Sequence, residues 1–239
     1  MTDIPAGNSA APDEVRRMFD RIAPVYDIMN TIMTAGIDAR WRRDAIVAAR
    51  LEPGMRALDV ACGTGMLTRA AARRVGPNGQ AVGVDLSEGM LRRARGWRPP
   101  GGAAVPEFIA ADALALPFDD GQFDAVTVGF GLRNMPDYRA ALAEMRRVAL
   151  PGGRVVVLEI AVPRTGVASV LFRTWFERIV PRLGRLAGGG GAYRYLPASV
   201  LRYPPPEAIA QQMRDVGLEP VRWRWLTSGM ATLHVGRRG

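Results

Sequence analysis

The chain has 239 residues, of which 48% are hydrophobic, and this is enough for one domain with a substantial core. Its net charge of +9 comes from arginines scattered along the chain, and its one cysteine, Cys62, excludes an internal disulfide. The sequence contains no run of about 18 apolar residues, which excludes a membrane-spanning helix, and its first residues do not resemble a signal peptide, so we expect a cytoplasmic protein.

The N-terminal part predicts helices. Residues 1–11 are rich in small residues, proline and acids and are expected to form a disordered lead. Apolar residues recur at helical spacing over 12–30, where Pro24 is expected to break or kink the helix. A further helical stretch is expected over 36–50, so that the segment 12–50 forms two N-terminal helices.

Short apolar strands alternate with helices from residue 51 to residue 160. Strands are expected at 56–61, 80–85, 105–110, 123–129 and 154–160. Helices are expected at 66–75, 87–96 and 137–149. This alternation predicts a parallel sheet with helices on both faces, because strands that are apolar almost throughout are typical of burial on both sides.

Residues 161–205 interrupt this pattern and are interpreted as a lid-like insertion, with a helix at 169–180 and four glycines at 188–191. A C-terminal segment, 206–239, then supplies a helix at 206–216 and an antiparallel hairpin from 219–226 and 230–236. We therefore predict a single α/β domain over residues 1–239, with a seven-stranded, mostly parallel sheet that has an antiparallel C-terminal hairpin strand.

The segment LDVACGTG, residues 58–65, predicts a ligand-binding turn. A buried strand is followed by a turn through Gly63 and Gly65 into a helix, whose first amides suit a carboxylate or a phosphate. Thr68 stands where a dinucleotide motif has its third glycine, which favours S-adenosylmethionine over NAD. Cys62 is interpreted as a small buried residue and not as a nucleophile.

Further candidate ligands follow the next strands. Asp85 is placed to accept hydrogen bonds from ribose hydroxyls, Asp112 and Ala113 to hold adenine, and Gly129 to lie under the methionine end. Each acid alone also suits a cap or a turn, but the carboxyl ends of parallel strands meet at one edge of a sheet. The predicted S-adenosylmethionine site consists of Asp59, Ala61, Gly63, Thr64, Gly65, Thr68, Asp85, Leu86, Asp112, Ala113 and Gly129.

LDVACGTG, GVD, ADALALPF and PGGR resemble class I methyltransferases in general. FDRIAPVYDIMNTIMTAGIDARWRR (19–43) and GFGLRNMPDYRAALAEMRRVALPGGRVVVLEI (129–160) resemble the two signature regions of the ubiquinone/menaquinone biosynthesis C-methyltransferase family. The segments IVPRLGRL, YRYLPASVLRYP and LTSGMATLHVGR are also similar, so the resemblance covers about residues 12–237. The chain departs from the family pattern at Asp38-Ala39, where the family commonly has His-Arg, and at Gly188 to Gly191, where it commonly has an acid.

The resemblance implies a Rossmann-like class I fold and S-adenosylmethionine-dependent methylation of a ring carbon of a prenylated quinol, without a metal. Arg133, Asn134 and Tyr26 are the candidate catalytic residues. Arg133 would stabilise a phenolate or polarise a water, Asn134 would orient a ring oxygen, and Tyr26 would bind the hydroxyl or shield the site. The alternatives are a salt bridge between Arg133 and Asp137, and a Tyr26 that only holds the N-terminal helix on the fold.

Other residues have structural and functional interpretations. His234 is expected to be structural, and Glu159 either lines the acceptor pocket or caps a turn. The candidates for a prenyl channel are Met18, Phe19, Ile22, Met29, Ile32, Met33, Val170, Leu171, Phe172, Trp175, Phe176 and Ile179. If exposed, such residues and the arginines would allow peripheral contact with the inner face of a membrane.

Two competing functions are open at this point. One is an O- or N-methyltransferase of secondary metabolism that acts on a soluble aromatic. The other is methylation or binding of RNA, but no specific nucleic-acid partner is expected, since the arginines form no basic block with interleaved aromatics. The sequence also leaves open whether the protein forms a homodimer.

Overall fold

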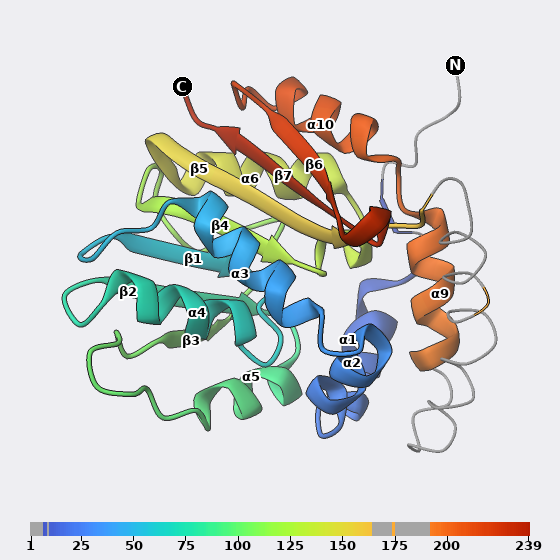
Figure 1. Ribbon diagram of the computed structural model, residues 1–239. Coiled ribbons are helices and arrows are strands. Elements are labelled where there is room, and N and C mark those ends of the chain that lie inside the picture. The colour runs from blue at the N-terminus through green and yellow to red at the C-terminus, as the bar shows by residue number, and fades with distance from the viewer. Residues whose placement is uncertain (1–6, 9, 164–173, 175–191) are drawn as a thin grey trace.

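The computed structural model describes residues 7, 8, 10–163, 174 and 192–239 (Figure 1). Within this part of the chain, seven strands form one sheet in the order β3-β2-β1-β4-β5-β7-β6. The strands are β1 (Arg56–Val60), β2 (Gln80–Asp85), β3 (Glu107–Ala110), β4 (Phe123–Gly129), β5 (Ala149–Ile160), β6 (Arg222–Leu226) and β7 (Ala231–Arg237). Strands β1 to β5 are parallel, β7 is antiparallel to β5 and β6 is antiparallel to β7, which confirms the predicted sheet and hairpin.

Helices cover both faces of the sheet (Figure 1). They are α1 (Pro12–Ile22), α2 (Tyr26–Thr34), α3 (Asp38–Ala49), α4 (Met66–Val75), α5 (Glu88–Arg95), α6 (Tyr138–Val148), α9 (Ala192–Arg202) and α10 (Pro206–Asp215), with short 3-10 helices η1 (Leu132–Asn134) and η3 (Thr227–Gly229). Helices α3 and α4 pack on one face, and α6 and α10 pack on the other.

Alternate residues of the central strands enter the two cores. In β1, Ala57 belongs to the core under α3 and α4, whereas Leu58 and Val60 belong to the core under α6 and α10. In β5, Val156 and Val157 likewise face opposite cores, and both are fully buried. Burial on both faces explains why these strands are apolar almost throughout.

Several element boundaries differ from the expected ones. The stretch 12–34 is broken at Pro24 into α1 and α2, so three helices and not two precede β1. Strand β5 begins at Ala149 and not at 154, because Ala149 pairs with Phe123 before an irregularity in the ladder. Residues 192–202, for which no element was expected, form α9. The predicted helix 169–180 and the glycines 188–191 lie outside the described residues, except for Thr174, which is helical.

The strand order reverses between β1 and β4. From β1 the chain proceeds through β2 to β3 on one side, and it then returns to build β4 and β5 on the other. Open α/β sheets bind ligands at this point, outside the carboxyl ends of the strands. Helices α1, α2 and α9 lie beside this edge (Figure 1). No helix of the described residues is long and apolar enough to cross a membrane.

Candidate active site

A cavity lies at the carboxyl ends of β1, β2 and β4. Most of the predicted cofactor residues line it: Ala61, Gly63, Thr64, Asp85, Leu86, Asp112, Ala113 and Gly129. The predicted acceptor residues Tyr26 and Asn134 line the same cavity. Asp59, Gly65, Thr68 and Arg133 are not among its lining residues. The structure therefore brings together, around one cavity, the residues expected to bind the methyl donor and those expected to bind the methyl acceptor. Four of the predicted residues do not line this cavity.

The glycine turn requires glycine for two reasons. Gly63 has φ = 58° and Gly65 has φ = 82°, values that side-chain-bearing residues rarely adopt. A Cβ on Gly65 would also lie 2.8 Å from the ring of Phe108, so the turn has no room for a side chain there. Gly65 is the N-terminal cap of α4, and the helix therefore begins immediately beside the cavity.

Asp59 supports the turn from below. The side chain is 2% exposed, and its carboxylate accepts hydrogen bonds from Thr68 Oγ1 at 2.7 Å and Thr127 Oγ1 at 2.9 Å. Burial raises the pKa of Asp59 to about 6, against these two hydrogen bonds. Asp59 and Thr68 thus tie β1 to α4 and β4, and they shape the turn without lining the cavity.

Asp85 connects two loops of the cavity. One carboxylate oxygen accepts from the amide of Gly63 and the other from the amide of Ser87, both at 2.8 Å. Burial raises the pKa of this carboxyl group. Asp112, after β3, accepts from the amide of Leu114 at 2.9 Å, as a turn residue does, and also lines the cavity. The two interpretations of these acids, as turn residues and as ligands, are compatible, because a carboxylate has lone pairs for both.

Two further carboxylates, which the sequence analysis did not single out, hold the N-terminal helices over the cavity. Asp20 of α1 accepts hydrogen bonds from Ser87 Oγ at 2.7 Å and from the amide of Gly89 at 2.8 Å, at the start of α5. Asp27 of α2 accepts from Thr64 Oγ1 at 2.6 Å. Both acids lie in the family-like stretch FDRIAPVYD, which was the only signal in the sequence for them.

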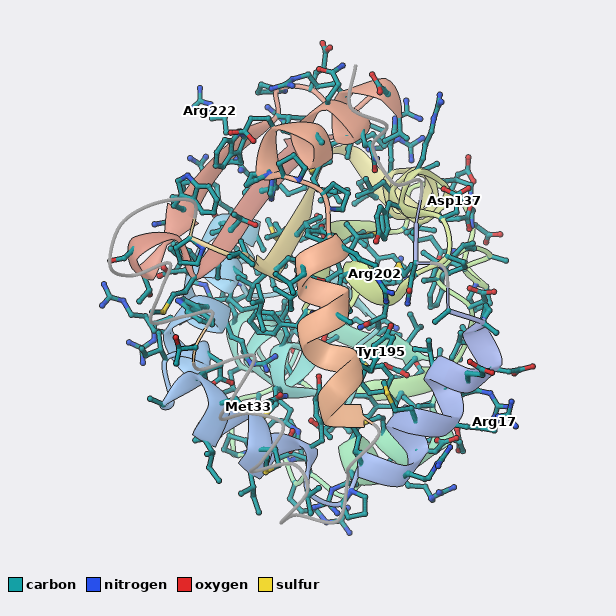
Figure 2. The ribbon with its side chains drawn as sticks, turned by 90° about the vertical axis from the view of Figure 1, so that its right-hand side faces the viewer. Arg17, Met33, Asp137, Tyr195, Arg202 and Arg222 are labelled. Carbon is teal, nitrogen blue, oxygen red and sulfur yellow. The ribbon has the colours of Figure 1, made fainter. Side chains whose placement is uncertain are left out.

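Asn134, one of the residues expected to bind the methyl acceptor, belongs to a network of polar side chains. Asn134 Oδ1 accepts from the Tyr195 hydroxyl at 3.1 Å, and Asn134 Nδ2 donates to the Phe130 carbonyl at 3.4 Å. Asn8 donates through Nδ2 to the Tyr195 hydroxyl, and its amide donates to the Met135 carbonyl at 2.8 Å. Figure 2 shows Tyr195 on the side of α9 that faces α1. Asn8 falls in the lead that we expected to be disordered, yet it is 9% exposed and joins α9 to η1.

Arg133 has a different partner from the one considered. Arg133 Nη1 lies 2.8 Å from Glu159 Oε2, and both side chains are buried. The alternative of an ion pair between Arg133 and Asp137 is therefore wrong. Asp137 instead caps α6 by accepting from the amide of Ala140 at 2.9 Å. Burial opposes the charged form of Arg133, but the Glu159 carboxylate, with smaller contributions from Tyr26 and Tyr195, raises the pKa of Arg133 above its usual value.

Glu159 is fully buried and also accepts from the amides of Arg133 and Ile160, both at 3.1 Å. It therefore neither lines the cavity nor acts as a simple turn cap.

His234 is placed as a core residue, in agreement with the structural role expected for it. Its ring is fully buried, Nε2 lies 2.9 Å from the Pro206 carbonyl, and the ring stacks on Trp223 at 5.8 Å. Burial lowers the pKa of His234 to about 4. Cys62 is also buried, and burial raises the pKa of its thiol well above the usual value, so it is not a thiolate nucleophile.

The predicted channel residues have different environments. Phe19 lines the cavity and Met18 packs beside a small core that contains Ile22, Met29 and Met33, whereas Ile32 is exposed. The residues Val170, Leu171, Phe172, Trp175, Phe176 and Ile179 lie outside the described residues. Among the residues that the structure describes, no cluster of histidines, cysteines and acids has the composition of a metal site.

The sheet order, the glycine turn after β1 and the acid at the end of β2 together define a class I methyltransferase. A solved structure with this fold, a possible histamine N-methyltransferase from Thermotoga maritima, superposes with a TM-score of 0.65 at 17% identity over 94% of this chain and 99% of that one.

The sequence comparisons identify the family. The model of the ubiE/COQ5 methyltransferase family matches residues 8–238, so the chain belongs to this family. Demethylmenaquinone methyltransferase of Thermus thermophilus is 47% identical over 92% of this chain and 100% of its own length. Ubiquinone/menaquinone biosynthesis C-methyltransferase UbiE of Geobacter sulfurreducens is 41% identical over 95% of this chain and 89% of its own.

Proposed function

We propose that this protein transfers the methyl group of S-adenosylmethionine to a ring carbon of a prenylated quinol, such as reduced demethylmenaquinone or a ubiquinone precursor. The observation that carries the proposal is the 47% identity, over the whole length of the relative, to a demethylmenaquinone methyltransferase. The reaction class is consistent with the cavity, which joins a glycine turn and two strand-end acids to a polar wall formed by Tyr26 and Asn134.

The residues of the cavity fit S-adenosylmethionine. Asp85 would accept hydrogen bonds from the ribose hydroxyls, and Leu86, Ala113 and Leu114 would contact the adenine faces. The amides at the start of α4 and the open backbone of Gly129 would face the methionine portion. The bound molecule supplies a methyl group that is already activated by its sulfonium, so the chain itself has to provide position and exclusion of water.

Tyr26 and Asn134 would bind the acceptor. Both line the cavity, and Asn134 is held by Tyr195 and by the Phe130 carbonyl. Polar groups of this kind can draw the phenol proton away from its oxygen, and the ring carbon then becomes more nucleophilic, which is the activation that C-methylation needs. Asn134 therefore has the role of orienting a ring oxygen.

Arg133 would act through this wall and not by direct contact. Its Nη1 donates to the Phe130 carbonyl, which also accepts from Asn134 Nδ2 at 3.4 Å. Arg133 is thus a positioning residue that fixes η1, and the Glu159 carboxylate fixes Arg133 in turn. This assignment replaces a direct contact with a phenolate, because Arg133 is not a lining residue of the cavity.

A prenylated acceptor also motivates peripheral contact with a membrane. Ile28 and Ile32 are exposed on successive turns of α2, next to the cavity-lining Tyr26. An apolar surface of this kind, on a chain with a net charge of +9, would contact anionic lipid and take the acceptor from it. Sedimentation with vesicles of phosphatidylglycerol at low salt tests this: the Ile28→Ser, Ile32→Ser double variant should bind less than wild type, and an unchanged fraction would contradict it.

The function is tested by transfer of labelled methyl from S-adenosylmethionine to reduced demethylmenaquinone, with mass analysis that locates the methyl group. Label on the ring carbon supports the proposal. Label on oxygen, or transfer only to a short soluble phenol, would instead favour a methyltransferase of soluble aromatics. Asn134→Ala should lower the rate strongly, whereas the exposed Arg139→Met should leave it unchanged.

A further inference from the structure

Arg42, which the sequence analysis noted only as part of a basic group, lines the cavity from α3. Its guanidinium lies over the ring of Phe130 at 5.0 Å from the centroid. Its Nη1 is 4.0 Å from the point that a Cβ on Gly129 would occupy. A cation therefore stands beside the end of β4, where the methionine portion of the donor is expected.

Asp38 holds this guanidinium from behind. Arg42 Nε and Nη2 both lie 3.4 Å from Asp38 Oδ2, and Asp38 Oδ1 accepts from Thr34 Oγ1 at 3.0 Å. The side chains of Arg42 and Asp38 are only 11% and 6% exposed. Arg42 Nη1 makes no hydrogen bond to any residue that the structure describes, so its donors are available toward the cavity.

The other cation in the cavity lining is at the wrong end for this role. Arg16 of α1 pairs with Asp13 at 3.2 Å and with Asp20 at 3.9 Å, and Asp20 is bound to Ser87 after β2. Among the described lining residues, Arg42 is thus the cation beside β4. Strands β2 and β4 are separated by β1, and neighbouring strands lie about 4.8 Å apart, so the ribose-binding and methionine-binding ends are about 10 Å apart.

We propose that Arg42, aimed by Asp38, binds the α-carboxylate of the methionine portion of S-adenosylmethionine. The inference rests on the proposed function, since it assumes that this cavity takes the methyl donor. The carboxylate is the one anionic group of the donor, and a guanidinium whose outer nitrogen is unpaired suits it. Asp38 prevents Arg42 from turning away, so it is a positioning residue.

The test compares two ligands that differ in the amino-acid portion. S-adenosylhomocysteine has the carboxylate, and 5′-methylthioadenosine lacks it while keeping adenine and ribose. We expect Arg42→Met to weaken binding of S-adenosylhomocysteine by about 10- to 100-fold in calorimetry, the range for a hydrogen bond to a charged group. Binding of 5′-methylthioadenosine should change less than about twofold, which separates a lost carboxylate contact from a deformed cavity.

Arg43→Met is the matched control, because it removes the same charge from the exposed neighbour on α3. It should leave both affinities unchanged. Asp38→Asn should weaken only S-adenosylhomocysteine, by less than Arg42→Met does. If Arg42→Met does not fold, Arg42→Lys replaces it and should show a smaller loss with the same selectivity for the carboxylate.

Equal weakening of both ligands, or no weakening of either, in the Arg42 variants would overturn the proposal for Arg42. Failure of the wild-type protein to bind either ligand would instead contradict the donor site itself. The two failures are therefore distinguishable.

Discussion

The buried pair of Arg133 and Glu159 allows a quantitative test of the acceptor wall. Arg133→Met leaves the Glu159 carboxylate fully buried without its cation, and breaking one partner of a buried ion pair costs about 3–5 kcal/mol. Glu159 keeps two amide donors, those of Arg133 and Ile160 at 3.1 Å, so we expect about 3 kcal/mol, the lower end of that range. Urea unfolding at pH 7.5, followed by circular dichroism, measures this loss.

The double variant Arg133→Met, Glu159→Gln distinguishes the loss of an ion pair from a general loss of packing. The backbone amides of Arg133 and Ile160 donate to different oxygens of Glu159, so the single amide oxygen of Gln can accept from one of them, but no unpaired charge is buried. We expect the double variant to recover part of the stability, since neutral replacements of buried ion pairs are often tolerated. The exposed Arg139→Met should change the free energy of unfolding by less than about 0.5 kcal/mol.

Activity of the same variants tests the positioning role. The double variant should remain slow in methyl transfer, because Met cannot donate to the Phe130 carbonyl. Its affinity for S-adenosylhomocysteine should be that of wild type, since Arg133 does not line the cavity. A single variant that loses less than about 1 kcal/mol would refute the energetic argument. A stable double variant with full activity would refute the role of Arg133 in positioning.

Three further predictions concern buried groups. Burial lowers the pKa of His234 to about 4, so its contribution to stability is present above about pH 6.5 and is lost as the pH falls toward 4. The difference in unfolding free energy between wild type and His234→Gln should therefore shift by about 1.4 kcal/mol per pH unit in this window. A constant difference would contradict this prediction. The pKa of Asp59 is raised to about 6, so its pH dependence has the opposite sign: its contribution to stability is present below about pH 4 and is lost as the pH rises through 6. The excess in unfolding free energy of wild type over Asp59→Asn, measured in urea titrations, should therefore shrink by about 3 kcal/mol from pH 4 to 6. An increase of this excess would refute the raised pKa. Gly65→Ala should lower the free energy of unfolding by at least about 1 kcal/mol and weaken binding of the methyl donor, because φ is 82° and a Cβ would touch Phe108. Gly101 has open space around it, so Gly101→Ala should change neither the melting temperature nor this affinity.

The order of elements from 51 to 160 was predictable because each element is encoded locally. Strands buried on both faces read as apolar runs, and Ser87, which caps α5 by accepting from the amide of Met90 at 3.2 Å, is a recognisable start signal. The helix α9 was missed, since Pro197 lies within it and proline usually excludes a helix interior.

The sequence by itself also determined most of the residues that line the cavity proposed for the methyl donor. The glycine turn, Asp85 and Asp112 each follow a strand, and parallel strands bring their carboxyl ends to one edge whatever their order. The pattern therefore predicted which residues meet, without requiring the path of the chain between them.

Only the tertiary structure decided the partners of the remaining polar groups. Glu159 meets Arg133 because β5 lies beside β4, and Asn8 meets Tyr195 across 187 positions of the chain. Arg42 reaches the cavity because α3 passes beside Gly129. A local pattern reports the conformation and burial of its own segment, whereas pairing between distant side chains depends on how the sheet orders its strands and on where the helices cross it.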